Sequence, residues 1–365
     1  MEMLQARKVL GLISGSSLDG VNAAVIATDG VDVFEKSTIL DVPYDDELRE
    51  KLRWLHRHYT TATEQEKLAI EEDVTKFHAN IVNDIKENYD QNIELIGFHG
   101  HTIFHNPAEH YIYHIGNGQM LADLTGIKTV SRFRQADILS GGLGAPLSGV
   151  YHQAIVADME KPITIVDIGG ISTLTWVGIN GEMMSFDTGP GNNAINDWVL
   201  KHGGQHMDYN GKLAATGKVN LSILKQLTHH KFIAKFPPKA ADKDTFRDKL
   251  EHLEGLSLED GAATATAFIA EAIAYSIAFY LPETPKSIII CGGGAKNPTL
   301  VRFIRQQLPE IEIKTAEDFG WDSSAIEAQA FAYLAARRIN FIPSSYPFTT
   351  GVQQPCICGE VFSPK

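Results

Sequence analysis

The 365-residue chain is too long for one ordinary compact core, so its length predicts two packed lobes. Hydrophobic residues make up 44% of the sequence and charged residues 21%, a balance that argues against disorder. The net charge of -13 disfavours binding to nucleic acid or to an anionic membrane, so we expect a small-molecule substrate.

The N-terminal region predicts a β-hairpin. The apolar run at residues 9–13 is too short for a signal peptide or a membrane span, and it reads as a buried strand. A polar turn at residues 14–20 and a second strand at residues 21–27 follow it. A strand-to-strand turn of this kind disfavours a P-loop, in which a helix follows the first strand.

Next, Thr63 and Glu66 have the spacing of a capping box, and apolar residues at helical spacing after them predict a long amphipathic helix. A strand at residues 93–98 then leads into a histidine-rich stretch. The glycine-rich segment 129–147 is the candidate hinge between the lobes.

The second half of the chain repeats the opening pattern. Residues 163–177 again read as strand, Gly-Gly turn and strand, which predicts an internal duplication. A helix at residues 261–280, a strand with a glycine turn at residues 287–298 and a helix at residues 324–339 complete an α/β order.

Three glycine-containing loops are candidates for nucleotide binding. The turns at residues 15–20 and 167–173 could offer backbone N–H groups and hydroxyls to phosphate oxygens, although ordinary hairpin turns have the same composition. The three glycines after Cys291 permit close approach to a flat ligand such as adenine, or else a tight strand-to-helix turn.

Two carboxylates are candidates for chemistry. Asp187, at the end of a predicted short strand, could serve as a general base, or it could cap the helix that follows. Glu327, three residues after Ser324, could face a cleft or complete a capping box.

The histidine-rich stretch contains His99, His101 and His105, a pattern that some metal-dependent hydrolases also use. No matching acidic or histidine cluster follows it, so a metallohydrolase is the less favoured alternative. Cys291, Cys356 and Cys358 supply neither a disulfide framework nor a zinc pattern, and we therefore expect a cytoplasmic protein.

Seven blocks in this order resemble the anhydro-N-acetylmuramic acid kinase family: ISGSSLDG, FHGHTIFH, FRQADILSGGLGAPL, DIGGIST, FDTGPGN, YNGKLAATGKVN and CGGGAKNPTL. The resemblance implies two ribonuclease-H-like, actin-like ATPase lobes with a cleft between them. We expect the first lobe to comprise residues 1–128 and about 340–365, and the second to comprise residues 129–339.

The resemblance also implies site residues. Those expected to bind ATP are Gly15, Ser16, Ser17, Leu18, Asp19, Gly20, Val21, Asn22, Gly169, Gly170, Gly292, Gly293, Gly294 and Asn297. Those expected to bind the sugar are His99, Arg134, Gly144, Ala145, Pro146, Asp187 and Glu327. Asp187 and Glu327 are the expected catalytic pair, and Asp19 is expected nearest to Mg²⁺, directly or through water.

Enzymes of this family open the 1,6-anhydro bridge of 1,6-anhydro-N-acetylmuramic acid and phosphorylate O6, using ATP and water, during peptidoglycan recycling. Asp187 would take a proton from the attacking water while the departing O6 is captured by the γ-phosphorus. Many members of the family pair, which makes a homodimer one expectation.

Several positions depart from the family pattern: Ser16 for Thr, Asn22 for Asp, His101 for Gln, Asp167 for Asn and Thr173 for Asn. In addition, Ala240–Asp244 replaces a stretch that usually contains an arginine and a glycine. These departures keep two alternatives open: a kinase for another anhydrosugar such as levoglucosan, and a catalytically silent sugar- or nucleotide-binding relative.

Overall fold

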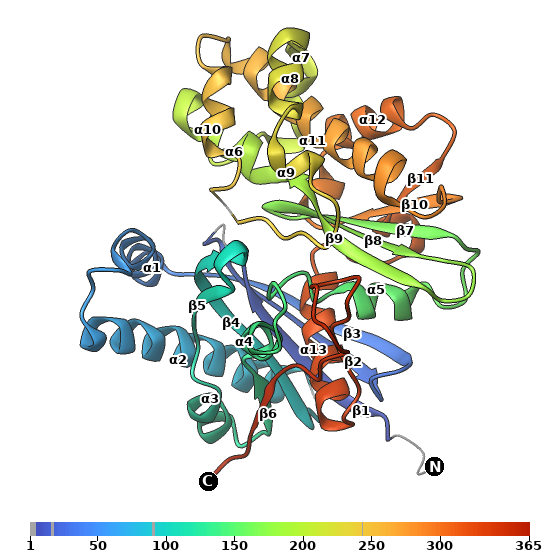
Figure 1. The fold of residues 1–365 in the computed structure, drawn as a ribbon. Helices are drawn as coiled ribbons and strands as arrows, with labels where there is room; N and C mark the ends of the chain where they lie inside the picture. The colour runs from blue at the N-terminus through green and yellow to red at the C-terminus, as the bar shows by residue number, and fades with distance from the viewer. Residues whose placement is uncertain (1–4, 16–17, 90–91, 243) are drawn as a thin grey trace. The chain divides into compact units, whose positions relative to one another are not determined.

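The computed structural model describes residues 5–15, 18–89, 92–242 and 244–365 (Figure 1). The chain forms two compact units. Unit 1 comprises Met1–Ile155 and Ala325–Lys365, and unit 2 comprises Val156–Ser324.

Unit 1 is built on a seven-stranded sheet with the order β12-β6-β4-β1-β2-β3, in which β5 also pairs with β4. Its strands are β1 (Arg7–Ser14), β2 (Gly20–Thr28), β3 (Val33–Pro43), β4 (Leu95–Asn106), β5 (Tyr111–Ile115), β6 (Thr129–Ser131) and β12 (Glu360–Phe362). Strands β1 and β2 are antiparallel neighbours joined across residues 15–19, so the predicted N-terminal hairpin is confirmed.

The helices of unit 1 are α1 (Asp46–His58), α2 (Glu64–Asn88), α3 (Gly118–Thr125), α4 (Phe133–Leu139), α5 (Gly149–Ile155) and α13 (Ile326–Ile339), with the short turn η1 (Pro107–Glu109). The predicted capping box opens α2: the Thr63 N–H donates to Glu66 Oε2 at 2.7 Å, and the Glu66 N–H donates to Thr63 Oγ1 at 3.3 Å. Helix α13 packs on β1, β2 and β4, far from it in sequence. The C-terminal helix therefore belongs to the first unit's core.

Unit 2 has a five-stranded sheet with the order β11-β10-β7-β8-β9. Its strands are β7 (Ile163–Ile168), β8 (Ile171–Val177), β9 (Met183–Pro190), β10 (Ser287–Cys291) and β11 (Glu312–Thr315). Its helices are α6 (Asn192–Gly203), α7 (Lys212–Thr216), α8 (Leu221–Thr228), α9 (Lys231–Ala234), α10 (Arg247–Leu250), α11 (Leu258–Tyr280) and α12 (Pro298–Gln307). Short turns complete it: η2 (Tyr209–Gly211), η3 (Glu251–Leu253), η4 (Gly293–Lys296) and η5 (Ala316–Phe319).

Helix α11 is the central helix of unit 2. Its 23 residues are long and apolar enough to cross a membrane, but 72% of its most apolar window is buried inside the protein. It contacts α6, α7, α8, α12 and β9, so its apolar surface is used for packing within this unit.

The two sheets share one topology. In unit 1, β6, β4 and β1 run parallel, and β2 and β3 follow in antiparallel pairings. In unit 2, β11, β10 and β7 run parallel, and β8 and β9 follow in the same way. This repetition confirms the predicted internal duplication and the two ribonuclease-H-like lobes of the actin-like ATPase fold.

The unit boundaries differ from those expected at residues 128 and 340. Residues 129–155 belong to unit 1 because β6 pairs with β4 and β12, and residues 325–339 belong there because α13 packs on β1 and β4. The segment 129–147 therefore lies inside unit 1. The chain instead passes between the units at residues 155–156 and 324–325.

Candidate active site

Asp187 lies inside β9 of unit 2 and is 4% exposed. Thr173 Oγ1 donates a hydrogen bond to its Oδ1 at 2.8 Å, and the Ala241 N–H donates to its Oδ2 at 2.8 Å. Helix α6, which follows β9, begins after Gly191 without a side-chain cap. The helix-capping interpretation of Asp187 is therefore wrong, and hydrogen bonds to both carboxylate oxygens hold the side chain in place.

The second predicted phosphate loop packs against the turn that follows Asp187. The Asn192 N–H donates to Gly169 O at 2.8 Å, and the Gly191 N–H donates to Gly170 O at 3.1 Å. A Cβ on Gly191 would lie 2.4 Å from Gly169 O, so only glycine allows this approach. The DIGGIST and FDTGPGN motifs thus form one structural element.

The two glycines of this loop have different surroundings. A Cβ on Gly170 would lie 2.7 Å from Asn193 Nδ2, whereas a Cβ on Gly169 would meet only Ile171 O, at 3.7 Å, an ordinary contact. Packing within the protein therefore does not require glycine at position 169. A ligand that approaches the loop closely would require it.

The predicted adenosine segment lies at the end of β10. Gly292 has φ +72°, a conformation that favours glycine, and a Cβ there would lie 2.3 Å from Asp167 Oδ1. A Cβ on Gly294 would lie 2.5 Å from Ile168 Cβ, whereas one on Gly293 would meet only Asn192 Nδ2, at 3.2 Å. Gly292 and Gly294 therefore hold this turn against β7, next to the second phosphate loop.

Asn297 has a structural role in addition to any ligand contact. Its Oδ1 accepts hydrogen bonds from the N–H groups of Thr299 at 3.1 Å and Leu300 at 3.0 Å, which caps α12. Thr299 Oγ1 donates to Gly211 O at 2.8 Å, which joins this segment to the YNGKLAATG motif.

The first predicted phosphate loop joins β1 to β2 in unit 1. Ser16 and Ser17 lie outside the described residues. Arg49 Nε donates to Leu18 O at 3.2 Å, and the Tyr44 N–H donates to Asp19 O at 3.0 Å, so the end of the loop is held by Arg49 of α1 and by Tyr44 of the β3–α1 connection.

Of the other expected residues of this loop, some are packed against neighbouring residues and some are exposed to solvent. A Cβ on Gly20 would lie 2.2 Å from Val42 O, and Val21 is buried, whereas Asn22 is partly exposed. The Asp19 carboxylate is exposed and has no hydrogen-bond or ion-pair partner among the described residues. An exposed carboxylate fits a hard cation such as Mg²⁺.

Three expected sugar-binding positions meet in unit 1. Arg134 Nε donates to His99 Nε2 at 2.9 Å, and Arg134 Nη1 donates to Gly144 O at 3.0 Å. Since His99 Nε2 accepts this bond, Nδ1 carries the proton and donates to Gly100 O at 3.0 Å. Burial and the Arg134 charge hold the pKa of His99 well below its usual value, so the ring is neutral.

The Gly144–Pro146 segment is fixed by buried polar groups. The Gly144 N–H donates to Asp137 Oδ2 at 2.7 Å, and Thr350 Oγ1 donates to Asp137 Oδ1 at 2.6 Å. Gly144 has φ +77°, and the Ala145–Pro146 peptide bond is cis. Asp137, which the sequence did not single out, is fully buried and orients this segment.

Glu327 lies in the first turn of α13, which begins without a side-chain cap after Ala325. The capping interpretation of Glu327 is therefore wrong as well. Its side chain is exposed, while neighbouring protein atoms that displace water raise the pKa of its carboxyl and the Arg134 guanidinium opposes this effect. The charge of Arg134 therefore acts on Glu327, which lies in the same unit.

The three histidines of the HGHTIFH stretch lie on β4 and have separate partners. His99 bonds to Arg134, His101 Nδ1 lies 2.7 Å from Ser14 Oγ, and His105 Nε2 donates to Leu143 O at 2.8 Å. These contacts give each ring a structural role and give no support to the metallohydrolase alternative.

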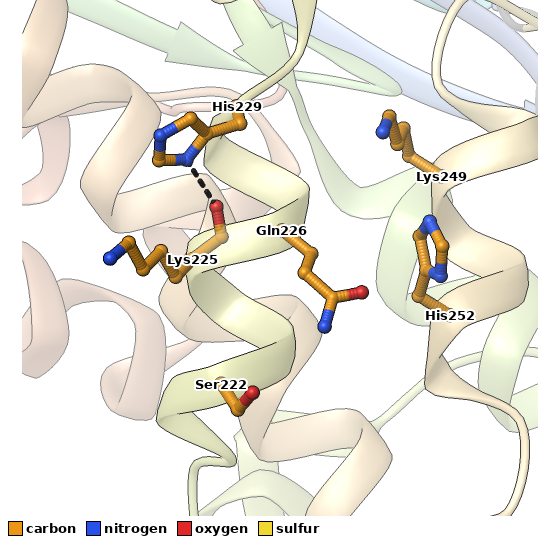
Figure 2. Close-up of a pocket in the computed structure, with 6 residues that line it drawn as sticks. All are labelled: Ser222, Lys225, Gln226, His229, Lys249 and His252. Carbon is orange, nitrogen blue, oxygen red and sulfur yellow. Dashed lines mark hydrogen bonds between the residues drawn. The ribbon is translucent and has the colours of Figure 1, made fainter.

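A shallow pocket in unit 2 lies between α8 and the α10–η3 segment, and Figure 2 shows Gln226 pointing from α8 toward the side that carries His252. It is lined by Ser222, Lys225, Gln226, His229, Lys249 and His252. None of the expected site residues lines it. The candidate site residues are therefore Asp187 and the glycine turns in unit 2 and, in unit 1, the group formed by Arg134, His99 and Gly144, here called the Arg134 group.

A family model and two sequence relatives that match this chain carry the same family description. The family model described as "Anhydro-N-acetylmuramic acid kinase" matches residues 7–364. A protein of that name from Paramagnetospirillum magneticum is 41% identical over 350 residues, covering 95% of this chain and 97% of the relative. Another from Zymomonas mobilis is 39% identical over 363 residues, covering 96% and 98%.

Among solved structures, the activator of 2-hydroxyisocaproyl-CoA dehydratase from Clostridium difficile aligns with a TM-score of 0.46. It is 13% identical, and the alignment covers 92% of this chain and 96% of that one. The sequence relatives, and not this alignment, carry the comparison.

Proposed function

The chain belongs to the anhydro-N-acetylmuramic acid kinase family and is an ATP-using sugar kinase, and from this premise we propose how its residues divide the work. Asp187 is the general base that takes a proton from a water molecule attacking the anomeric carbon. The bond from that carbon to O6 breaks, O6 bonds to the γ-phosphorus, and ADP leaves. The products are N-acetylmuramic acid 6-phosphate and ADP.

The observation that carries this proposal is the environment of Asp187. A general base must be fixed and close to its proton, and here each carboxylate oxygen is held by a donor at 2.8 Å inside a strand. In the same unit, the turns at Gly169–Gly170 and Gly292–Gly294 would bind ATP through their backbone N–H groups. In unit 1, Leu18 to Asn22 belong to the first predicted phosphate loop and would bind ATP phosphates as well.

Recognition of the sugar belongs, in this proposal, to the Arg134 group. His99 and Gly144 O orient the guanidinium, and the adjoining Ala145 and Pro146 complete this part of the proposed sugar site. Glu327 is the second carboxylate at the substrate. Asp19 would hold Mg²⁺, directly or through water, and the ion would neutralise charge on the β- and γ-phosphates.

We also propose a cytoplasmic location, which the three cysteines support because they supply no disulfide framework. Two chains pairing as a homodimer is a further proposal, taken from the family resemblance.

ADP release tests the proposed reaction. Purified protein is given Mg-ATP with 1,6-anhydro-N-acetylmuramic acid, levoglucosan or N-acetylmuramic acid, and the product is identified by mass. A product heavier than the first sugar by one phosphoryl group (HPO3) plus one water molecule supports the proposal. Turnover with levoglucosan alone identifies another anhydrosugar kinase, and no turnover with any sugar favours a silent relative.

Substitution of Arg134 by lysine tests the sugar site. Lysine cannot bond to His99 Nε2 and Gly144 O while also presenting a planar fork, so we expect KM for the anhydrosugar to rise about tenfold or more. KM for ATP stays within about twofold. Arg132→Lys is the matched control, because Arg132 is exposed and pairs with Glu360 at 2.9 Å. An equal rise in KM in both variants contradicts the assignment.

Substitution of Gly169 by alanine tests the second phosphate loop. Since the new Cβ meets only Ile171 O at 3.7 Å, the melting temperature should stay the same while KM for ATP rises about tenfold. Gly294→Ala is the contrasting variant, because its Cβ would lie 2.5 Å from Ile168 Cβ and should lower stability. An unchanged KM for ATP in Gly169→Ala removes this residue from the nucleotide site.

A further inference from the structure

Lys239 is a fully buried lysine without a role in the reaction described above. Its Nζ lies 3.2 Å from each of the carbonyl oxygens of Phe232 and Ile233. The rings of Phe186, Phe232 and Tyr280 surround it, with centroids at 5.7, 5.0 and 4.6 Å. Aromatic faces and carbonyl oxygens attract an ammonium, so this cage fixes the side chain in one place.

The backbone of the same segment grips Asp187. The Lys239 carbonyl accepts the Asp187 N–H at 3.0 Å, and two residues later the Ala241 N–H donates to Asp187 Oδ2 at 2.8 Å. Phe186, which precedes Asp187, is also one wall of the cage. Fixing the lysine therefore fixes both the chain that holds the carboxylate and the strand that carries it.

Thr173 holds the other carboxylate oxygen. Its hydroxyl, on β8, donates to Asp187 Oδ1 at 2.8 Å. The two oxygens are thus held by donors from two separate elements, which prevents rotation of the carboxylate about its bond to Cβ. Donors on both oxygens also favour the ionised form, which is the form that accepts a proton.

We infer that Lys239 and Thr173 are positioning residues for Asp187: Thr173 orients one carboxylate oxygen directly, and Lys239 anchors the backbone that orients the other. This inference rests on the proposed function of Asp187 as general base. It assigns a role to the Lys239–Ala241 segment, which overlaps the stretch where the sequence departs from the family pattern.

Thr173→Val keeps the shape of the side chain and removes the donor. We expect kcat to fall about tenfold to a hundredfold, KM for ATP to stay within about twofold, and the acidic limb of the kcat/KM profile to move to higher pH. Thr173→Ser retains the hydroxyl and should restore both kcat and the profile. A Val variant with the wild-type kcat and pH profile overturns the role of Thr173.

Lys239→Met tests the anchor, with Lys235→Met, an exposed lysine of the same segment, as control. Burial lowers the pKa of Lys239 to about 8, with Asp187 acting against this and Lys235 adding to it. Burial raises the pKa of Tyr280 to about 12, so Tyr280 stays neutral when Lys239 loses its proton. We therefore expect a wild-type basic limb near pH 8, caused by loss of the ammonium.

In Lys239→Met this basic limb should be absent and kcat should already be about tenfold lower below pH 8, with the sugar KM changed much less. Melting temperatures identify a variant that does not fold. If Lys239→Met does not fold, the presence or absence of the wild-type basic limb near pH 8 tests the role of Lys239, and Thr173→Val tests the role of Thr173. The wild-type basic limb persisting in Lys239→Met overturns the role of Lys239.

Wild type and Asp187→Asn are assayed alongside to separate the two proposals. If Asp187→Asn loses turnover while Thr173→Val and Lys239→Met keep all of it, the positioning role is rejected and the proposed function stands. Absence of wild-type turnover with every anhydrosugar rejects the proposed function itself.

Discussion

Replacing Asp187 by asparagine should reduce kcat about 10³-fold or more while leaving the affinity for ATP nearly unchanged. The amide has the shape of the carboxylate but cannot take a proton from water. Its Oδ1 can accept the Ala241 N–H, and its Nδ2 can donate to Thr173 Oγ1, because a hydroxyl both donates and accepts. The substitution therefore removes the base and retains the surrounding contacts.

Asp208 offers a matched control in the same unit. It is 7% exposed, and its two carboxylate oxygens accept the N–H groups of Leu213 at 2.8 Å and Ala214 at 3.0 Å. In Asp208→Asn the amide nitrogen must face one backbone N–H, so we expect a stability loss of about 1–3 kcal/mol with kcat retained. If Asp187→Asn instead destabilises the protein as Asp208→Asn does and loses ATP binding, Asp187 is a structural aspartate.

Local sequence signals predicted much of the fold because they depend on neighbouring residues. The Thr63–Glu66 capping box and the two strand-turn-strand repeats form as expected. The strand-turn-strand pattern of residues 163–177 also predicted a turn at Gly169 and Gly170, and the structure shows that turn packed on Gly191.

Predictions that depended on long-range packing were less accurate. The boundary at residue 340 was wrong because the amphipathic pattern of α13 does not reveal which unit it packs on. Its position depends on contacts with β1, more than 300 residues earlier in the chain. The glycine-rich stretch after Thr129 suggested a hinge, but its glycines serve a loop that Asp137 organises from inside unit 1. A single buried aspartate seven residues before Gly144 was the signal that sequence reasoning missed.

The candidate site shows the same distinction. Asp187 and Arg134 were identified from the motifs, whereas the partners that hold Asp187 come from β8 and from a loop about fifty residues further along the chain. Thr173 and the segment after Lys239 stood out as departures from the family pattern, but their sequence positions did not show that both meet Asp187. Such convergence is a property of the folded sheet.

Gly11→Ala should cost about 4 kcal/mol or more in the free energy of unfolding, or prevent folding of unit 1 altogether. A Cβ on Gly11 would lie 1.8 Å from Ala328 O and 2.8 Å from Ala332 N, both backbone atoms of α13. Neither the helix nor the buried strand β1 can move without disturbing its other contacts. Urea unfolding, with the soluble yield recorded, measures the loss.

The clash is with main chain, and this gives the prediction a specific control. Ala328→Gly removes only a methyl group and leaves the carbonyl in place, so the Gly11→Ala, Ala328→Gly double variant should show no rescue. Gly97→Ala, whose Cβ would lie 2.1 Å from Phe331 O, should be destabilising to a similar degree because it opposes the same helix. Wild-type stability in Gly11→Ala, or rescue in the double variant, would mean that α13 does not approach β1 closely. That result would also remove the basis for placing Glu327, the neighbour of Ala328, in unit 1 with Arg134.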